Sequence, residues 1–349
     1  MTRARLVQRL IVPPIVAITL AGCSNAPADP GPSPAPTKQE STVAEGFTNP
    51  VYATNFADPH ILPDGDGFIA FATNGNAMNV QTATSADMVS WQQGSDALPT
   101  LPSWSSPGKV WAPETIKWSD GTYRMYYTTM VVGQDRQCLS VATSDTAAGP
   151  YVDDSTEPLM CEVDEGGSID SSPFVASDGT AWLYWKNDGN HIGVDTFIRV
   201  APLTEDGMAV QGETTDVLKQ DLAWEDMLVE GPSVWEHDGT FHMFYSGNGF
   251  WTDKYAVGHA VADSPTGPFV KDPDPVLVTN DVAAGPGHNS LIEVGDQLWM
   301  VYHAWEPDAV GDEATGRQMW LSRVSFTDGD GVEVEPPLAD HPETPTKAS

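Results

Sequence analysis

One repeated kind of segment decides the fold, and its clearest copy is VEGPSVWEHDGTFHMFY, residues 229–245. The segment has a start that contains proline, a short apolar run, an Asp-Gly turn and a second run rich in aromatic residues. Asp-Gly between two β-favouring runs predicts a tight hairpin, because these residues accept the positive φ angles of a type I′ turn.

Four further segments repeat this pattern about every 58 residues. They start at Asp58-Pro59, Ala112-Pro113, Ser172-Pro173 and Gly287-His288, with turns at Asp66-Gly67, Asp120-Gly121, Asp178-Gly179 and a reversed Gly295-Asp296. Each unit also carries a second hairpin motif, so we expect about four strands per unit. One such sheet leaves both faces exposed, whereas five sheets around an axis cover one another.

The sequence therefore predicts an all-β protein, a five-bladed β-propeller over residues 46–335, followed by a polar C-terminal tail over residues 336–349. A β-sandwich is the alternative fold, but a sandwich has no regular period of this length.

The composition agrees with this fold and excludes a nucleic-acid partner. The 349 residues include 49 acidic and 16 basic side chains, which gives a formal net charge of -33. A polyanion would be repelled by such a surface. The 31 Gly and 29 Pro supply turns, and the 12 Trp supply core area.

The N-terminus predicts export with a lipid anchor. Residues 1–22 hold three arginines and then an apolar run from Leu10 to Leu20, which is shorter than the roughly 20 residues of a membrane-spanning helix. Leu20-Ala21-Gly22-Cys23 resembles a bacterial lipobox, in which Cys23 is lipidated after cleavage, and residues 23–45 form a Pro- and Ala-rich tether. We expect attachment to the outer face of the cell membrane through the lipid alone. An ordinary secretory signal, which would give a secreted protein, is the alternative.

Two further cysteines, Cys138 and Cys161, remain after such cleavage. In an exported protein they are expected to pair as a disulfide, and two free buried thiols are the alternative.

Acidic residues recur at the starts of the repeated segments. The innermost strands of all blades begin at the same end of the central channel, so residues there converge on the axis. These positions carry Asp58, Glu114, Asp170, Glu230 and His288. Because like charges repel, several carboxylates at one channel mouth indicate a chemical task or a bound cation.

The five segments resemble those of glycoside hydrolase family 43, whose members are five-bladed propellers. The matching motifs are Ala57-Asp58-Pro59, Trp111-Ala112-Pro113-Glu114, Ser168-Ile169-Asp170-Ser171-Ser172-Pro173, Val229-Glu230-Gly231-Pro232-Ser233 and Gly285-Pro286-Gly287-His288-Asn289-Ser290. The resemblance runs from about residue 50 to about residue 330. It implies hydrolysis of a glycosidic bond with inversion, in which Asp58 is the general base, Glu230 the general acid and Asp170 the third carboxylate.

Elementary chemistry fits these implied roles. Inversion needs an ionised carboxylate that activates water and a protonated carboxyl group that protonates the departing oxygen. Room for the water predicts that the carboxyl groups of Asp58 and Glu230 are roughly 6.5 to 9.5 Å apart. Asp58 must keep a low pKa, and Asp170 would act on Glu230 by charge repulsion and by orienting it.

Three other residues are expected to bind substrate. Trp111 lies beside the axis and would stack on a sugar ring, with packing between blades as the alternative. Arg317 resembles an arginine that the family directs at substrate hydroxyls, with an exposed ion pair as the alternative. Glu114 is the third. Trp104, Phe250 and Trp251 are weaker aromatic candidates in loops.

His288 resembles an axial histidine that contacts a central cation or its water shell in family members. Calcium prefers oxygen ligands, so we expect contact through water, and a neutral buried histidine is the alternative. His303 also matches the family, but its strand position favours a core histidine. No organic cofactor is expected.

The sequence therefore predicts a monomeric O-glycosyl hydrolase that acts on oligo- or polysaccharides. The first expected substrates are α-L-arabinofuranosyl linkages, as in arabinan or arabinoxylan, and β-xylosides come second. A non-catalytic carbohydrate-binding propeller is the alternative from another class. Such a protein would be expected to lack a catalytic carboxylate, whereas Asp58, Asp170 and Glu230 are all present.

Overall fold

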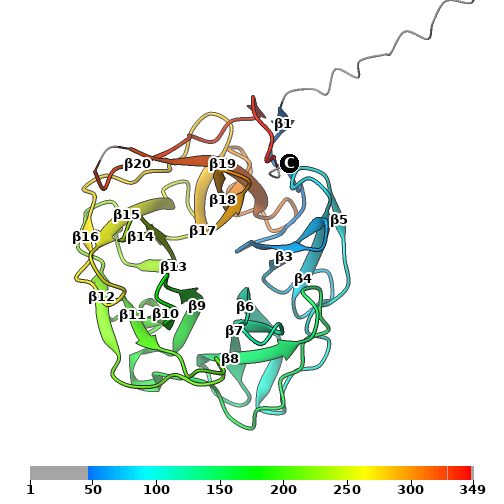
Figure 1. The fold of residues 1–349 in the computed structure, drawn as a ribbon, viewed down its shortest axis with the longest axis vertical. Coiled ribbons are helices and arrows are strands. Elements are labelled where there is room, and N and C mark those ends of the chain that lie inside the picture. Colours follow the sequence, from blue (N-terminus) through cyan, green and yellow to red (C-terminus); the bar gives the residue numbers. More distant parts are fainter. Residues whose placement is uncertain (1–45, 328, 347–349) are drawn as a thin grey trace, which may run out of the picture. The chain divides into compact units, whose positions relative to one another are not determined.

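Five β-sheets stand in a ring around a central axis in the computed structural model, which describes residues 46–327 and 329–346 (Figure 1). This arrangement confirms the predicted five-bladed propeller. The predicted signal peptide, Cys23 and the tether lie outside the described residues. Within the described part of the chain, no helix is long and apolar enough to cross a membrane.

Four of the blades are four-stranded antiparallel meanders. Blade 1 consists of β2 (His60–Asp64), β3 (Gly67–Ala72), β4 (Gln81–Ser85) and β5 (Trp91–Gln93), and blade 3 of β9 (Ser168–Val175), β10 (Ala181–Asn187), β11 (Phe197–Pro202) and β12 (Thr215–Lys219). Blade 4 consists of β13 (Val229–His237), β14 (Thr240–Gly247), β15 (Ala256–Ala262) and β16 (Val270–Lys271), and blade 5 of β17 (Ala284–Val294), β18 (Gln297–Trp305), β19 (Gln318–Phe326) and β20 (Val332–Val334). The first strands of neighbouring blades contact one another around the axis.

Blade 2 has three strands, where the repeat predicts four. They are β6 (Ser105–Lys117), β7 (Tyr123–Val131) and β8 (Gln137–Ser144). The segment that follows β8 makes isolated bridges to its edge, Thr143 with Val152 and Leu139 with Met160, and no fourth strand among the residues that the structure describes.

The remaining elements are short. They are β1 (Phe47–Thr48), the 3-10 helix η1 (Val163–Glu165), the helix α1 (Gly189–Ile192) and β21 (Asp340–His341). β21 lies within the predicted polar tail, but it pairs with β1, and His341 is buried and stacks on Phe47 with ring centroids 4.8 Å apart. Part of the predicted tail is therefore ordered by its contact with Phe47 of β1.

Cys138 of β8 and Cys161 form a disulfide. Cys161 lies in the segment that leads to η1 and then to β9. The covalent bond thus fixes the chain that enters blade 3 to blade 2.

The hairpin turns are more varied than the repeated Asp-Gly suggests. Both central residues have positive φ only at Asp238-Gly239, with 49° and 84°. At Asp120 and Asp178 the strands are instead joined by five-residue loops, in which the Asp side chain accepts a backbone N–H at 2.8 Å. Asp-Gly predicted the place of these hairpins correctly and the type I′ geometry in only one of them.

One residue in the left-handed conformation occurs within, or just before, the first strand of every blade. These residues have φ between 42° and 58° and are Asp58, Ala112, Asp170, Gly231 and His288. In blades 2 to 5 the register with the second strand shifts at this point, as in a β-bulge. Bulges re-aim local side chains. Here the register shifts turn side chains of different blades toward the central axis.

Side chains at the ends of the second strands connect these five left-handed residues from blade to blade. In four junctions, a side chain accepts the backbone N–H of the left-handed residue in the next blade. The pairs are Thr73 with Ala112 at 3.0 Å, Thr128 with Asp170 at 3.1 Å, Ser246 with His288 at 2.8 Å and His303 with Asp58 at 3.2 Å.

Lys186 occupies the corresponding position in blade 3, where it is paired with Ile169. A charged ammonium group has no lone pair to accept an N–H. The N–H of Gly231 is bound by Asp170 instead, at 3.1 Å, and the amine of Lys186 is directed to Glu230. The break in the repeat therefore lies at one of the predicted catalytic residues.

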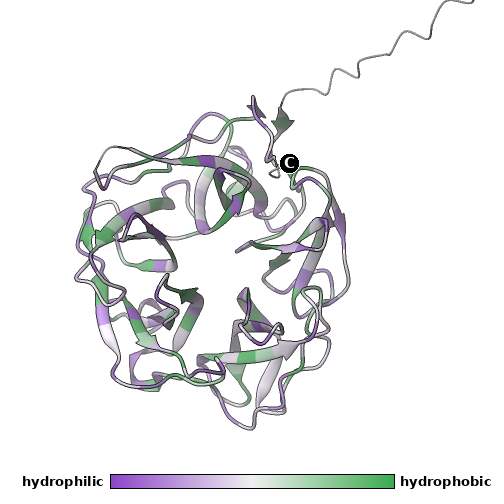
Figure 2. Cartoon of the chain, viewed as in Figure 1, coloured by the Kyte–Doolittle hydropathy of each residue, from purple (hydrophilic) through white to green (hydrophobic). Residues whose placement is uncertain are grey.

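Apolar side chains from neighbouring blades fill the spaces between the sheets. Ile61 and Phe68 of blade 1, for example, share a buried cluster with Val301 and Leu321 of blade 5. Hydrophobic segments recur in every blade in Figure 2. This packing holds the five first strands in place around the axis.

Candidate active site

A pocket of about 340 Å³ opens at the end of the ring where the first strands begin. It is lined by residues from all five blades: Asp58, Thr73, Trp111, Ile169, Asp170, Asp188, Asn190, His191, Glu230, Phe250, Trp251, His288 and Arg317. The structure thus brings together the three predicted carboxylates with Trp111, His288 and Arg317.

Asp58 is buried and is surrounded by hydrogen-bond donors and positive charge. Its Oδ1 lies 2.8 Å from Arg317 Nη1 and 3.5 Å from His288 Nδ1, and its Oδ2 accepts the Thr73 hydroxyl at 2.5 Å. Burial alone would raise the pKa of Asp58, but the neighbouring Arg317 and His288 hold it well below its usual value. Asp58 is therefore an ionised carboxylate in a buried place.

His303 supports Asp58 from the side that faces away from the pocket. Its Nδ1 accepts the backbone N–H of Asp58, and burial lowers the pKa of His303 to about 3, so the ring is neutral near pH 7. The ring also stacks on Tyr255, with centroids 5.6 Å apart. The core position expected for His303 is correct, but this core histidine touches a site residue.

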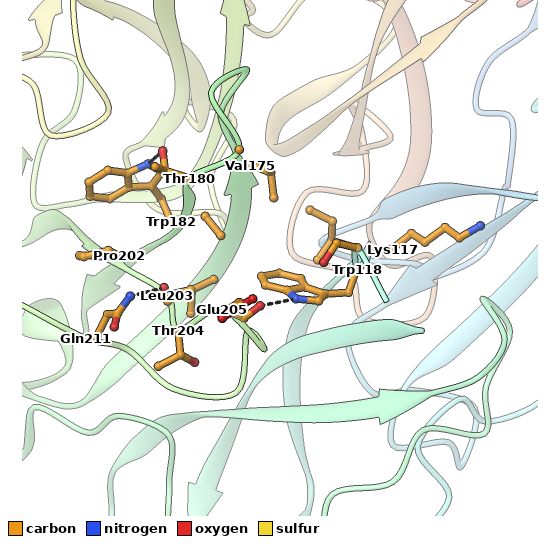
Figure 3. A pocket seen from close by; sticks show the side chains of 14 residues that line it. Lys117, Trp118, Val175, Thr180, Trp182, Pro202, Leu203, Thr204, Glu205 and Gln211 are labelled. Carbon is orange, nitrogen blue, oxygen red and sulfur yellow. Dashed lines mark hydrogen bonds between the residues drawn. The ribbon is translucent and has the colours of Figure 1, made fainter. Parts of the chain in front are cut away.

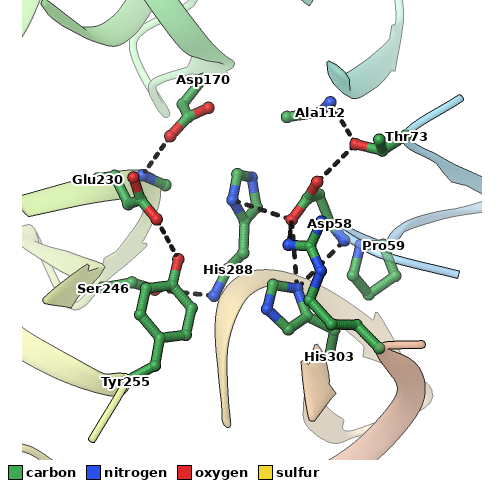
Figure 4. A network of polar contacts seen from close by, with 12 residues as sticks. Asp58, Pro59, Thr73, Ala112, Asp170, Glu230, Ser246, Tyr255, His288 and His303 are labelled. Atoms are coloured by element: carbon green, nitrogen blue, oxygen red, sulfur yellow. Dashed lines mark hydrogen bonds and ion pairs between the residues drawn. The ribbon is translucent and has the colours of Figure 1, made fainter. Parts of the chain in front are cut away.

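Glu230 lies across the pocket from Asp58, with His288 between them (Figure 4). Its Oε1 accepts the hydroxyl of Tyr255 at 2.7 Å, and its Oε2 lies 3.3 Å from the amine of Lys186. Lys186 is fully buried, and Glu230 is 7% exposed. Each carboxylate oxygen of Glu230 therefore has one fixed donor, and none of these donors is shared with Asp58.

Asp170 lies in the same layer and bonds to the backbone of the next blade through Gly231. Burial raises the pKa of Asp170 to about 6, and the charges of Glu230 and Asp58 act in the same direction, while His288 and Lys186 oppose them. Asp170 therefore changes its charge in a range where Asp58 stays ionised.

His288 contacts Asp58 through Nδ1, and its backbone N–H is bound by Ser246. Calcium takes six to eight oxygen ligands. In the described part of the chain, no group of three or more His, Cys, Asp or Glu side chains is arranged to hold a metal ion. The protein side chains around His288 thus do not fit a directly coordinated calcium ion, and contact through a water shell stays a prediction.

Aromatic side chains form the outer part of the pocket. Trp111 is half-buried and lines it, as do Phe250 and the exposed Trp251. The Arg317 guanidinium lies over the ring of Phe250, 4.4 Å from its centroid, which fixes the arginine beside Asp58. Flat apolar faces next to polar groups suit the binding of sugar rings.

Glu114 is not among the residues that line this pocket, and its contact with substrate stays a prediction. It lies two residues beyond the left-handed Ala112, on the far side of the bulge. There it accepts the Ser172 hydroxyl at 2.9 Å and lies 4.0 Å from His60 Nδ1. Burial raises the pKa of Glu114 to about 8. A bulge cannot be placed from the repeat alone, and it moved this side chain deeper into the channel.

Sequence reasoning missed Lys186, Asp188, Asn190 and Tyr255. The first three lie in one stretch, Lys186-Asn187-Asp188-Gly189-Asn190, which ends an apolar strand. A lysine directly after Trp182-Leu183-Tyr184-Trp185 was a usable signal, because buried lysines are rare unless they are paired. Tyr255 lies at the start of β15 and carries no local signal of its contact with Glu230.

A larger pocket, of about 800 Å³, lies between blades 2 and 3, near the other ends of their first strands (Figure 3). Trp118 and Trp182 are on its walls, and each indole N–H is bound to a neighbouring oxygen at 2.8 and 2.9 Å. Among the described residues that line it, the charged ones are Lys117 and Glu205. This pocket therefore lacks the paired carboxylates that glycoside hydrolysis needs.

Comparison with known proteins agrees with the geometry. The model of the family "Glycosyl hydrolases family 43" matches residues 47–330. A β-D-galactofuranosidase of Aspergillus niger is 29% identical over 271 residues, which are 73% of this chain and 75% of the relative. An extracellular endo-α-(1→5)-L-arabinanase of Thermotoga petrophila is 26% identical over an alignment that covers 62% of this chain and 50% of that relative.

Solved structures give the same result. The crystal structure of a thermostable family-43 glycoside hydrolase superposes with a TM-score of 0.79 at 28% identity, over 86% of this chain and 100% of that chain. An endo-1,4-β-xylanase from Bacteroides thetaiotaomicron superposes with a TM-score of 0.71 at 26% identity, over 85% and 99% of the two chains. The chain therefore belongs to glycosyl hydrolases family 43 and is a glycosidase.

Proposed function

We propose that this glycosidase is an exported, inverting enzyme that cleaves furanosyl linkages of neutral glycans, with α-L-arabinofuranosyl linkages first. Asp58 takes a proton from a water whose oxygen bonds to the anomeric carbon. The bond from that carbon to the glycosidic oxygen breaks, and Glu230 gives its proton to the departing oxygen. Asp170 is the third carboxylate, and Trp111 and Arg317 hold the sugar.

The unequal surroundings of the two facing carboxylates carry this proposal. Asp58 is bound by Arg317 and contacts His288, which suits a base that must remain ionised. Glu230, on the other side of His288, has a different set of donors. A base and an acid on opposite sides of one pocket are what inversion requires.

The relatives support the choice of furanosides. The two most similar relatives described above are a galactofuranosidase and an arabinanase, and the second is called extracellular, which supports export. β-D-Galactofuranosides are therefore a second candidate substrate class. β-Xylosides remain the other alternative, and lipid attachment through Cys23 remains part of the proposal.

A panel of nitrophenyl arabinofuranoside, galactofuranoside and xyloside, with intact arabinan and xylan, tests the substrate. Proton NMR of the first product anomer tests inversion. We expect Asp58→Asn to reduce turnover of every substrate by about 10²- to 10⁴-fold. Glu230→Gln should reduce glycan turnover similarly and nitrophenyl turnover less, because nitrophenolate departs with little protonation.

The control is Asp154→Asn, which removes the same charge from an exposed residue outside the pocket. Wild-type turnover of intact glycan by one of these variants would reject the role of the residue that it replaces. A product that keeps the anomeric configuration would reject inversion alone.

A further inference from the structure

The stretch from Lys186 to Asn190 places a carboxylate in the pocket for which hydrolysis itself has no role. Asp188 lines the pocket and is 7% exposed. Among the described residues, no donor hydrogen-bonds to its carboxylate, although the positive charges of Lys186 and His191 act on it. A buried carboxylate usually has fixed donors, so its free acceptor positions indicate a ligand that supplies hydroxyl groups.

Asn190 offers the complementary group. Its Oδ1 accepts the amine of Lys186 at 2.6 Å. Because an ammonium group can only donate, this contact fixes the oxygen toward Lys186 and leaves the amide NH₂ of Asn190 as the group for the pocket. Asp188 and Asn190 thus provide an acceptor and a donor two residues apart.

The backbone around these residues is fixed from both sides. The N–H of Asp188 bonds to the carbonyl of Gly167 at 2.9 Å, and a Cβ on Gly166 would lie 2.0 Å from the carbonyl oxygen of Asp188. On the other flank, the Asn187 side chain bonds to Asp195 and Phe197 at 3.0 and 2.7 Å. Only glycine permits such a close approach at position 166. The pair therefore stands on a rigid support.

The position of Asp188 and Asn190 in the pocket indicates which sugar of the substrate they would bind. Lys186 bonds both to Asn190 and to Glu230, so the pair lies on the Glu230 side of the pocket. In an inverting reaction the departing sugar leaves from the face of the acid, and water attacks from the face of the base. Resting on the function proposed above, we propose that Asp188 and Asn190 form a subsite for the leaving-group sugar of a neutral glycan, with Asp188 accepting its hydroxyls and Asn190 donating to one of its oxygens.

The test compares two substrates that need the same proton donation. Methyl α-L-arabinofuranoside and α-1,5-arabinobiose both lose an alkoxide, but only the disaccharide places a sugar in the subsite. The methyl xyloside and xylobiose form the second pair. A lost hydrogen bond to a charged group predicts that Asp188→Asn lowers kcat/KM for the disaccharide about 10- to 100-fold more than for the methyl glycoside.

Asn190→Ala, at a half-buried residue, is the second variant if Asp188→Asn does not fold. Its loss should also be larger for the disaccharide. Asp154→Asn is the charge-matched control and should leave the ratio of the two substrates unchanged. Equal losses on both substrates by folded variants would overturn the subsite while leaving the proposed function intact.

Binding provides a readout that does not depend on turnover. If the wild-type protein hydrolyses none of these four substrates and none of the panel given above, the proposed function fails. Titration with arabinobiose and xylobiose then tests the subsite without turnover. Weaker disaccharide binding by Asp188→Asn than by the wild type supports it. Equal affinity, or binding by neither protein, overturns it.

Discussion

At Asp58, burial and neighbouring charge act in opposite directions on one carboxyl group. Burial raises its pKa, but Arg317 and His288 more than offset this effect. Arg317 is the first of these causes, and its Nη1 lies 2.8 Å from the carboxylate. The ionised state of the proposed base therefore depends on a residue that lies 259 positions away in the sequence.

Replacement of this arginine should be visible in the pH profile. In Arg317→Met the charged form of Asp58 loses its main stabilising partner, so the pKa of Asp58 rises. A base with a higher pKa is protonated at higher pH, and the acid limb of kcat/KM should therefore shift upward in pH. Arg323→Met, which removes an arginine stacked on Trp299, is the control and should not shift the limb. An unshifted limb in Arg317→Met would separate Arg317 from the ionisation of the base.

The sequence predicted the residues that lie at the starts of the first strands. Asp58, Asp170 and Glu230 stand there, and convergence follows from the repeat alone. Lys186 and Tyr255 escaped prediction because they come from other strands, and their contacts with Glu230 exist only after the blades are packed. The place of the Glu114 side chain could not be predicted for another reason, because it depends on a register shift within β6.

At the scale of single strands, the left-handed residue in or just before each first strand determines which side chains face the pocket. Ala112 and Asp170 adopt φ of 42° and 58°, although residues with a Cβ disfavour this region. No local signal marks them, so sequence reasoning placed the strands correctly and missed the bulges. Gly231 is the exception, because glycine adopts this conformation readily.

Gly231 also leaves room for its neighbour. A Cβ at this position would lie 3.2 Å from His288 Nδ1. Gly231→Ala should cost about 1–2 kcal/mol through its positive φ and should also displace His288, which contacts Asp58. We therefore expect a lower melting temperature together with a lower kcat/KM.

The matched control for this prediction is Gly239→Ala. Gly239 has φ of 84° and no heavy atom within 4 Å of an added Cβ. This variant should lose similar stability and keep its kcat/KM. Full activity of Gly231→Ala would show that the ring of His288 is not held by this close approach.

At the scale of the whole molecule, closure of the ring and formation of the site are one event. The chain before blade 1 runs along blade 5, where Tyr52 bridges Met319 and the N–H of Phe56 bonds to the carbonyl of Arg317 at 2.8 Å. This contact sets Arg317 beside Asp58. The repeat predicts five blades, but it cannot show how the first and fifth are joined, because the joining residues lie outside the repeated pattern.

Asn49 tests this joint. It is buried, and its side chain bonds to the carbonyls of Leu321 and Leu338 at 2.9 and 3.0 Å and accepts the N–H of Leu321 at 3.0 Å. Asn49→Ala leaves these backbone groups without partners, which should cost about 2–3 kcal/mol. For a domain of this size that corresponds to a melting temperature lower by roughly 3–5 °C.

The loss of activity on heating should follow the same shift, because opening of the joint separates Arg317 and His303 from Asp58. Asn79→Ala, which removes a hydrogen bond to the Leu98 carbonyl within blade 1, is the control and should shift both midpoints less. The two measurements are circular dichroism and residual activity after heating. If Asn49→Ala melts at the wild-type temperature, the two ends of the ring are held by the packing of Phe47 and His341, and the hydrogen bonds of Asn49 add nothing to closure.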